Sequence, residues 1–78
     1  DIYNIEKLNE IILTLSEYVA FRLRRYNMVA NVVNVGLRTN KFKDFSHQKK
    51  LDVATANTKD IYQKAKELLK EMYNRRSD

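Results

Sequence analysis

Between residues 31 and 53 the side chains alternate in polarity, and this pattern constrains the fold more than any other feature of the chain. Val33, Val35 and Leu37 occupy every second position, and polar or small residues lie between them. Because successive side chains of a strand point to opposite faces, the pattern predicts a strand with one apolar face. The polar series of this strand and of a second one comprises Asn34, Gly36, Arg38, Ser46, Gln48 and Lys50.

The two predicted strands span about residues 30–39 and 44–53, pair antiparallel and are joined by a basic loop. One face of this sheet is expected to pack on helices, and the other face is expected to stay open to solvent. On the helix-facing side the second strand is expected to carry Phe45, Leu51 and Val53, in a series that also contains His47 and Lys49.

A helix is predicted on each side of this hairpin, over about residues 5–27 and 58–75, because apolar residues recur there at helical spacing. Asn57 or Thr58 is expected to cap the second helix. The chain is therefore predicted to be a single α+β domain with the order α-β-β-α. The expected apolar stripes are Leu8, Ile11, Ile12, Leu15, Val19, Leu23 and Tyr26 in the first helix, and Ile61, Ala65, Leu68 and Met72 in the second.

The amino-acid composition excludes some classes of function and favours others. The chain has no cysteine and one histidine, so it offers no thiolate or histidine cluster for a metal, and we expect no cofactor. No run approaches the ~18 apolar residues of a membrane span, and the polar face of the first helix mixes both signs of charge, which argues against membrane binding. Fifteen basic against ten acidic residues give a net charge of +5, a modest bias toward anionic partners.

The open face of the predicted sheet has the chemistry to meet a phosphate backbone. Gly36 would let that backbone approach without a Cβ in the way. The Arg38 guanidinium can donate to two phosphate oxygens, and Ser46 can donate a neutral hydrogen bond. The alternative interpretation is an ordinary solvated sheet face. The candidate binding set, which includes two lysines of the loop, is Asn34, Gly36, Arg38, Lys41, Lys43, Ser46, Gln48 and Lys50.

Four segments together resemble the little finger, the C-terminal DNA-gripping domain of Y-family translesion DNA polymerases of the ImpB/MucB/SamB group. They are RLR at 22–24, VNVGLR at 33–38, FSHQKKL at 45–51 and DIYQKAKELL at 60–69. The resemblance runs through nearly the whole chain in the family's order. Within the family, the Val-Gly-Leu-Arg wording favours the UmuC-like branch over the DinB-like branch.

The resemblance implies a β-α-β-β-α-β domain, with a four-stranded antiparallel sheet and both helices on one face. The chain would then begin after the first strand and stop before the last, as an α-β-β-α fragment truncated at both ends. A two-stranded sheet is marginal alone and exposes both edges. We therefore expect the sheet edges to pair with further strands or with a second copy of the chain.

The resemblance also implies a function: gripping duplex template-primer DNA through its phosphates, without reading base sequence, within a damage-bypass polymerase of an SOS-type repair response. The catalytic carboxylates and Mg²⁺ would belong to an upstream palm domain. This chain is expected to hold no catalytic residue, and the parent chain to be a DNA-directed DNA polymerase. Expected partners are duplex DNA and the rest of the polymerase, in the bacterial cytoplasm near the nucleoid.

The competing interpretation is a protein-interaction module that captures a partner through its sheet edge, either as a homodimer or by contact with a processivity clamp. The sequence argues against an enzyme, because the chain has no Ser/His/Asp set for nucleophilic catalysis and no glycine loop that could bind a phosphate. A double-stranded RNA-binding domain would need a third strand, for which residues 54–57 leave no room.

Overall fold

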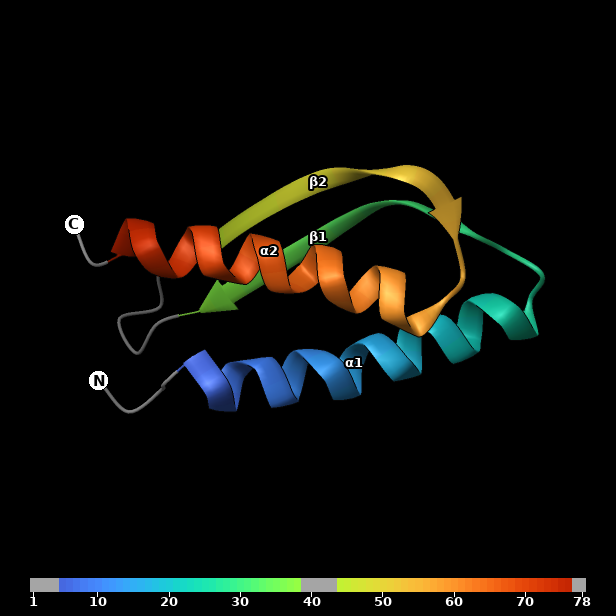
Figure 1. The fold of residues 1–78 in the computed structure, drawn as a ribbon, viewed down its shortest axis with the longest axis horizontal. Coiled ribbons are helices and arrows are strands. Elements are labelled where there is room, and N and C mark those ends of the chain that lie inside the picture. The colour runs from blue at the N-terminus through green and yellow to red at the C-terminus, as the bar shows by residue number, and fades with distance from the viewer. Residues whose placement is uncertain (1–4, 39–43, 77–78) are drawn as a thin grey trace.

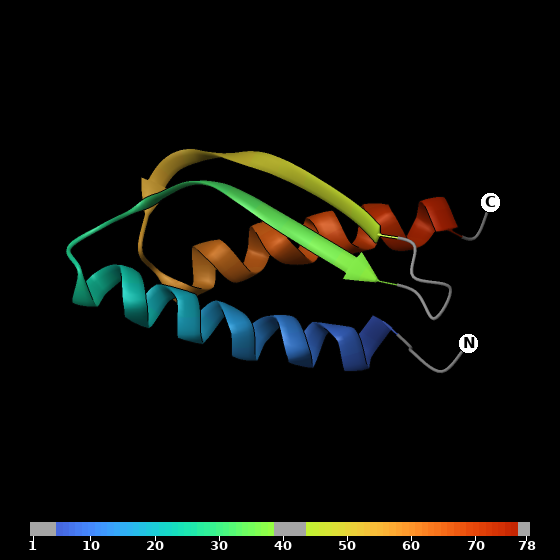
Figure 2. The same ribbon diagram turned by 180° about the vertical axis from the view of Figure 1, so that it is seen from behind.

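Two helices flank an antiparallel pair of strands in the order α-β-β-α, which confirms the predicted fold class (Figure 1). The computed structural model describes residues 5–38 and 44–76. The elements are α1 (Ile5–Arg25), β1 (Ala30–Arg38), β2 (Asp44–Thr55) and α2 (Thr58–Arg76). Both helices lie on the same side of the two-stranded sheet (Figures 1 and 2).

The strand register follows the predicted alternation over most of the hairpin. β1 and β2 pair without a shift from Val32 opposite Lys50 to Arg38 opposite Asp44. Val33 and Val35 are buried on the side that faces α2, and their neighbours Asn34 and Gly36 are exposed. One face of the sheet therefore packs on a helix and the other is solvated, as the period of two predicts.

The end of β2 departs from the prediction. Ala30 pairs with Thr55 and Val32 with Lys50, so residues 51–54 of β2 lie opposite residue 31 alone. β2 thus bulges and continues two residues beyond the expected end at 53. Extra residues in one strand bend it and turn its side chains out of the regular alternation. Val53, expected on the apolar face, is instead 76% exposed.

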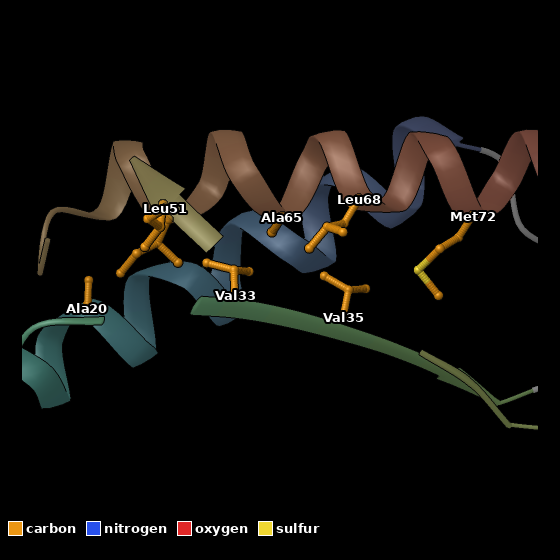
Figure 3. Close-up of a cluster of buried hydrophobic side chains, with 8 residues drawn as sticks. Ala20, Val33, Val35, Leu51, Ala65, Leu68 and Met72 are labelled. Atoms are coloured by element: carbon orange, nitrogen blue, oxygen red, sulfur yellow. The ribbon is translucent and has the colours of Figure 1, made fainter. Parts of the chain in front are cut away.

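The hydrophobic core lies between the sheet and α2 (Figure 3). The predicted α2 stripe is confirmed, because all four of its members are buried. Of the two expected caps, Asn57 or Thr58, Asn57 caps this helix, its side-chain oxygen accepting a hydrogen bond of 2.8 Å from the Lys59 backbone N–H. The Thr55 hydroxyl supports this start, since it accepts from the Asn57 N–H and donates to Asp60, each at 3.0 Å. The core cluster consists of Ala20, Val33, Val35, Leu51, Ile61, Ala65, Leu68 and Met72.

The C-terminus of α1 is closed by a left-handed residue. Asn27 has φ of 55°, the conformation that asparagine adopts more readily than most residues at the end of a helix. The Met28 N–H donates to the Leu23 carbonyl at 2.8 Å, and the Asn27 N–H to the Arg24 carbonyl at 3.2 Å. This pair of bonds is the Schellman motif, which ends the helix and turns the chain toward β1.

The packing of α1 corrects the sequence interpretation. α1 packs on α2 with Ala20 fully buried and Ser16 nearly so. Ile12 and Leu23 of the expected stripe are partly buried and pack against the core, as predicted. Leu15 and Val19, expected in the core stripe, are 53% and 44% exposed. Ile11 and Tyr26 of the same stripe are also exposed. The stripe is wider than the surface that α2 covers, so half of it remains without a neighbouring element among the described residues.

That uncovered half of α1 borders a groove beside β1, which we call the α1–β1 groove. α1 lies on the β1 side of α2 in both ribbon views (Figures 1 and 2). The groove has a volume of about 330 Å³. Its walls include Ile12, Leu15 and Val19 of α1, Ala30 and Val32 of β1, and Ile61 of α2.

Candidate nucleic-acid interface

The solvated side of the hairpin, which we call the open face, gathers five of the eight predicted site residues. The register pairs Asn34 with Gln48 and Gly36 with Ser46, and these four residues are exposed. Lys50, also exposed, pairs with Val32 in the next row of the same face. The regular alternation of β1 and β2 therefore produces a surface of amide, hydroxyl and ammonium donors around one glycine.

For three of the predicted site residues the structure does not describe the side chain. The backbone of Arg38 pairs with Asp44, which continues the register of the open face, and its side chain is not described. Lys41 and Lys43 lie outside the described residues. The described part of the candidate interface is thus made by the strands rather than by the loop.

Lys49 and His47 lie on the opposite side of β2, facing the helix layer. Lys49 forms ion pairs with Glu71 and, at 3.8 Å, with Glu67, both on α2. The hydrogen bond that the Lys49 ammonium donates to the Glu71 carboxylate raises the pKa of Lys49 above its usual 10.5. Desolvation lowers this pKa, and the charges of both glutamates raise it further. His47 pairs with Val35 on this side and is half-buried.

Asp44 also belongs to the open face, although it was not among the predicted site residues. It lies opposite Arg38 and is exposed. The signal was available, since Asp44 has the same parity in β2 as Ser46 and Gln48. Among the side chains described on this face, Lys50 is the cation and Asp44 the anion. The face therefore offers mainly neutral hydrogen-bond donors rather than a dense positive charge.

Two of the three arginines at the end of α1 have partners within the domain. Arg24 donates to the carbonyl of Ala56 at 2.8 Å and so ties the end of α1 to the start of α2. The Arg22 guanidinium lies over the ring of Tyr18, 5.7 Å from its centre. Arg22, Arg24 and Arg25 also occupy the last turn, where positive charge favours the helix dipole. These contacts agree with a structural role for the cluster.

Within residues 5–38 and 44–76 there is no group of three or more His, Cys, Asp or Glu side chains placed to hold a metal ion. No helix in that part of the chain is long and apolar enough to cross a membrane.

The fold and the sequence define the class of protein. Residues 1–77 match the family described as the impB/mucB/samB family C-terminal domain, and the chain belongs to this family. The match covers both helices and both strands, including the whole open face.

The curated relatives are polymerases. The chain is 39% identical over 75 residues to DNA polymerase IV of Clostridium acetobutylicum, an alignment that covers 96% of the chain and 19% of the relative. It is 32% identical over 74 residues to DNA polymerase IV of Acetivibrio thermocellus, covering 95% and 18%. It is 37% identical over 70 residues to DNA polymerase IV of Alkaliphilus oremlandii, covering 90% and 17%.

The chain thus spans about a fifth of the length of these relatives. These three relatives are named DNA polymerase IV, and none is named UmuC. The comparisons therefore do not support the prediction that the chain belongs to the UmuC-like branch. No solved structure matches the chain.

Proposed function

We propose that this domain grips duplex DNA through its open face, without regard to base sequence, as part of a Y-family DNA polymerase that copies damaged templates. One observation carries the proposal: in a domain of this polymerase family, Asn34, Gln48 and Lys50 are exposed together on the side of the sheet that no described helix covers. Such donors suit phosphate and sugar oxygens, which are the same along any sequence.

The chemistry of the contact follows from the mixture of side chains. Lys50 supplies charge to a phosphate, and the neutral groups of Asn34, Ser46 and Gln48 donate hydrogen bonds that orient the backbone. Gly36 lies opposite Ser46, and because glycine has no side chain, the nucleic acid can approach the strand closely there. We include Arg38, Lys41 and Lys43 in the same contact on the sequence evidence.

The wider role belongs to the same proposal. The chain would act with the rest of a polymerase whose upstream palm domain holds the catalytic carboxylates and Mg²⁺, and it would supply no catalytic group itself. We place it in the bacterial cytoplasm at the nucleoid, with a processivity clamp as a further protein partner.

The proposal is tested by the salt dependence of affinity for a short DNA duplex. Lys50→Met is expected to lower the steepness of the plot of log affinity against log salt by about 0.9, the contribution of one neutralised phosphate. Asn34→Ala and Gln48→Ala are each expected to weaken binding about two- to ten-fold, because each removes one neutral hydrogen bond. Their slopes should equal that of the unmodified chain.

The matched control is Lys70→Met, which removes the same charge from an exposed position of α2. It is expected to leave both the affinity at moderate salt and the slope nearly unchanged. Equal effects of Lys50→Met and Lys70→Met would show a general attraction to positive charge and would contradict a grip by the open face.

A further inference from the structure

The two methionines of the chain lie in opposite surroundings. Met28, in the link between α1 and β1, is 58% exposed, whereas Met72 of α2 is 3% exposed and belongs to the core (Figure 3). The chain has no cysteine, so these two thioethers are the side chains that a peroxide oxidises most readily. Because oxidation of a thioether depends on access of the oxidant, Met28 is the more susceptible of the two.

Met28 is also part of the motif that ends α1. Its N–H donates to the Leu23 carbonyl at 2.8 Å, and the N–H of Asn27 donates to the Arg24 carbonyl at 3.2 Å. In a Schellman motif the residue that follows the left-handed position commonly makes an apolar contact with the residue whose carbonyl it binds. Here these two residues are Met28 and Leu23, so the thioether occupies a position that helps to close the helix.

The packing around Met28 agrees with this role. Met28 and Leu23 line the same groove at the end of α1, which has a volume of about 270 Å³. Leu23 in turn is partly buried and packs against the hydrophobic core. An apolar connection therefore runs from the exposed methionine to the core. The groove is lined by Tyr18, Val19, Arg22, Leu23, Tyr26 and Met28.

The Schellman motif also sets where the chain enters the sheet. Residues 26–29 join the end of α1 to the start of β1, and this link lies at the far end of the domain from the N-terminus (Figures 1 and 2). Arg24 ties the same end of α1 to the carbonyl of Ala56, at the start of α2. A change in the polarity of Met28 would therefore act at a junction between α1, β1 and α2.

The chemistry of that change is a transfer of one oxygen atom. Hydrogen peroxide delivers an oxygen to the thioether sulfur, an S=O bond forms, the O–O bond breaks, and the second oxygen leaves as water. The sulfur is oxidised by two electrons and the peroxide is reduced by two. The product is a polar sulfoxide in place of an apolar thioether. Methionine sulfoxide reductases reverse the change, with two thiols oxidised to a disulfide and the oxygen released as water.

We propose that Met28 is a site of reversible oxidation by peroxide, and that its sulfoxide loosens the Schellman motif at the end of α1. The modified side chain loses its apolar contact with Leu23, because the S=O group is better solvated by water than by the groove. The hydrogen bonds of Met28 and Asn27 to the last turn of α1 then open more often. This inference does not depend on DNA binding by the open face.

The first test measures which methionine is oxidised. The folded 78-residue chain is treated with dilute hydrogen peroxide, digested with trypsin and analysed by mass spectrometry. Trypsin separates the two sites, because residues 26–38 form one peptide and residues 71–75 another. The exposed fractions of Met28 and Met72 differ about twenty-fold, so Met28 is expected to gain oxygen about ten-fold faster or more. In urea-unfolded chain the two rates should be nearly equal.

The second test reads the motif itself. Amide hydrogen exchange of the Asn27 and Met28 N–H groups is measured by NMR before and after oxidation, and it is expected to become about three- to ten-fold faster, the effect of losing one small apolar contact. The Lys59 N–H, which donates to the Asn57 cap of α2, is the internal control and should exchange at an unchanged rate. Treatment with methionine sulfoxide reductases and dithiothreitol should restore the original rates.

Two variants separate the sulfur from the contact. Met28→Leu keeps an apolar side chain without a thioether, so peroxide is expected to leave exchange at Asn27 and residue 28 unchanged. Met28→Gln has a similar length and a polar end, and it is expected to show the faster exchange without any peroxide.

The proposal is overturned if Met72 is oxidised as fast as Met28 in the folded chain. It also fails if the sulfoxide forms at Met28 and leaves exchange at Asn27 and Met28 unchanged, or if peroxide speeds exchange equally in Met28→Leu. Faster exchange of the Lys59 N–H to the same extent would show general loosening of the domain, which would likewise contradict an effect confined to the end of α1.

Discussion

Lys49 and Lys50 are neighbours in β2 and have opposite surroundings. Lys50 is exposed on the open face, and Lys49 reaches back to Glu67 and Glu71 on α2. The pleat of the strand accounts for the difference, because consecutive side chains lie on opposite faces. One lysine is therefore available to a phosphate, and the other joins β2 to the helix that supports it.

The pKa of Lys49 makes this second role measurable. Because the folded-state pKa is raised, mainly by the hydrogen bond to Glu71, its contribution to stability is complete below the unfolded value of about 10.5 and is lost as pH rises through the folded value. In urea unfolding, the stability difference between the unmodified chain and Lys49→Met is expected to stay constant from neutral pH to about pH 10 and to decline above it. A difference that persists unchanged well above the unfolded value would contradict the assignment.

At the scale of elements, α1 carries the main correction to the sequence interpretation. Its apolar residues recur at helical spacing, which identifies a face but not the extent to which a neighbour covers that face. α1 packs on α2 with Ser16 and Ala20 buried, and Ile12 and Leu23 of the stripe pack partly buried against the core. The exposed members of the stripe, including Leu15 and Val19, lie to one side of this contact.

Two adjacent positions of α1 test this packing. Ala20→Leu is expected to destabilise the domain by about 1–3 kcal/mol, because Ala20 is fully buried and leaves no room for a larger side chain. Val19→Ala is expected to change the unfolding free energy by about 0.5 kcal/mol or less, because Val19 is exposed to solvent. Denaturant unfolding measures both. The opposite ranking would show that Val19 belongs to the core after all.

The other elements show which structural features the sequence predicts and which it does not. The α2 stripe follows from spacing and was predicted, and Asn57 is one of the two residues expected to cap α2 by local hydrogen bonding. The bulge that exposes Val53 could not be predicted in the same way, because alternation describes one strand and a bulge depends on how two strands pair. The open face was found because it lies in the regular part of the hairpin.

At the scale of the whole molecule, the domain has two sides of different character. The open face is solvated, polar and nearly balanced in charge over its described side chains. The α1–β1 groove adjoins it at Asn34 and Gly36 and is otherwise lined mainly by aliphatic residues. The net charge of +5 is therefore not concentrated on the described part of the open face. We accordingly expect neutral donors to contribute affinity that does not depend on salt, and the steepness of the salt dependence to reflect only the phosphates that basic side chains neutralise.

The central claim is that the open face meets DNA, and NMR titration of the chain with a short duplex tests it most directly. The side-chain amides of Asn34 and Gln48 report on the open face, and that of Gln63, exposed on α2, is an internal control. If the open face meets DNA, the Asn34 and Gln48 signals shift with increasing DNA and the Gln63 signal stays in place. Movement of Gln63 with Asn34 and Gln48 unchanged would contradict it.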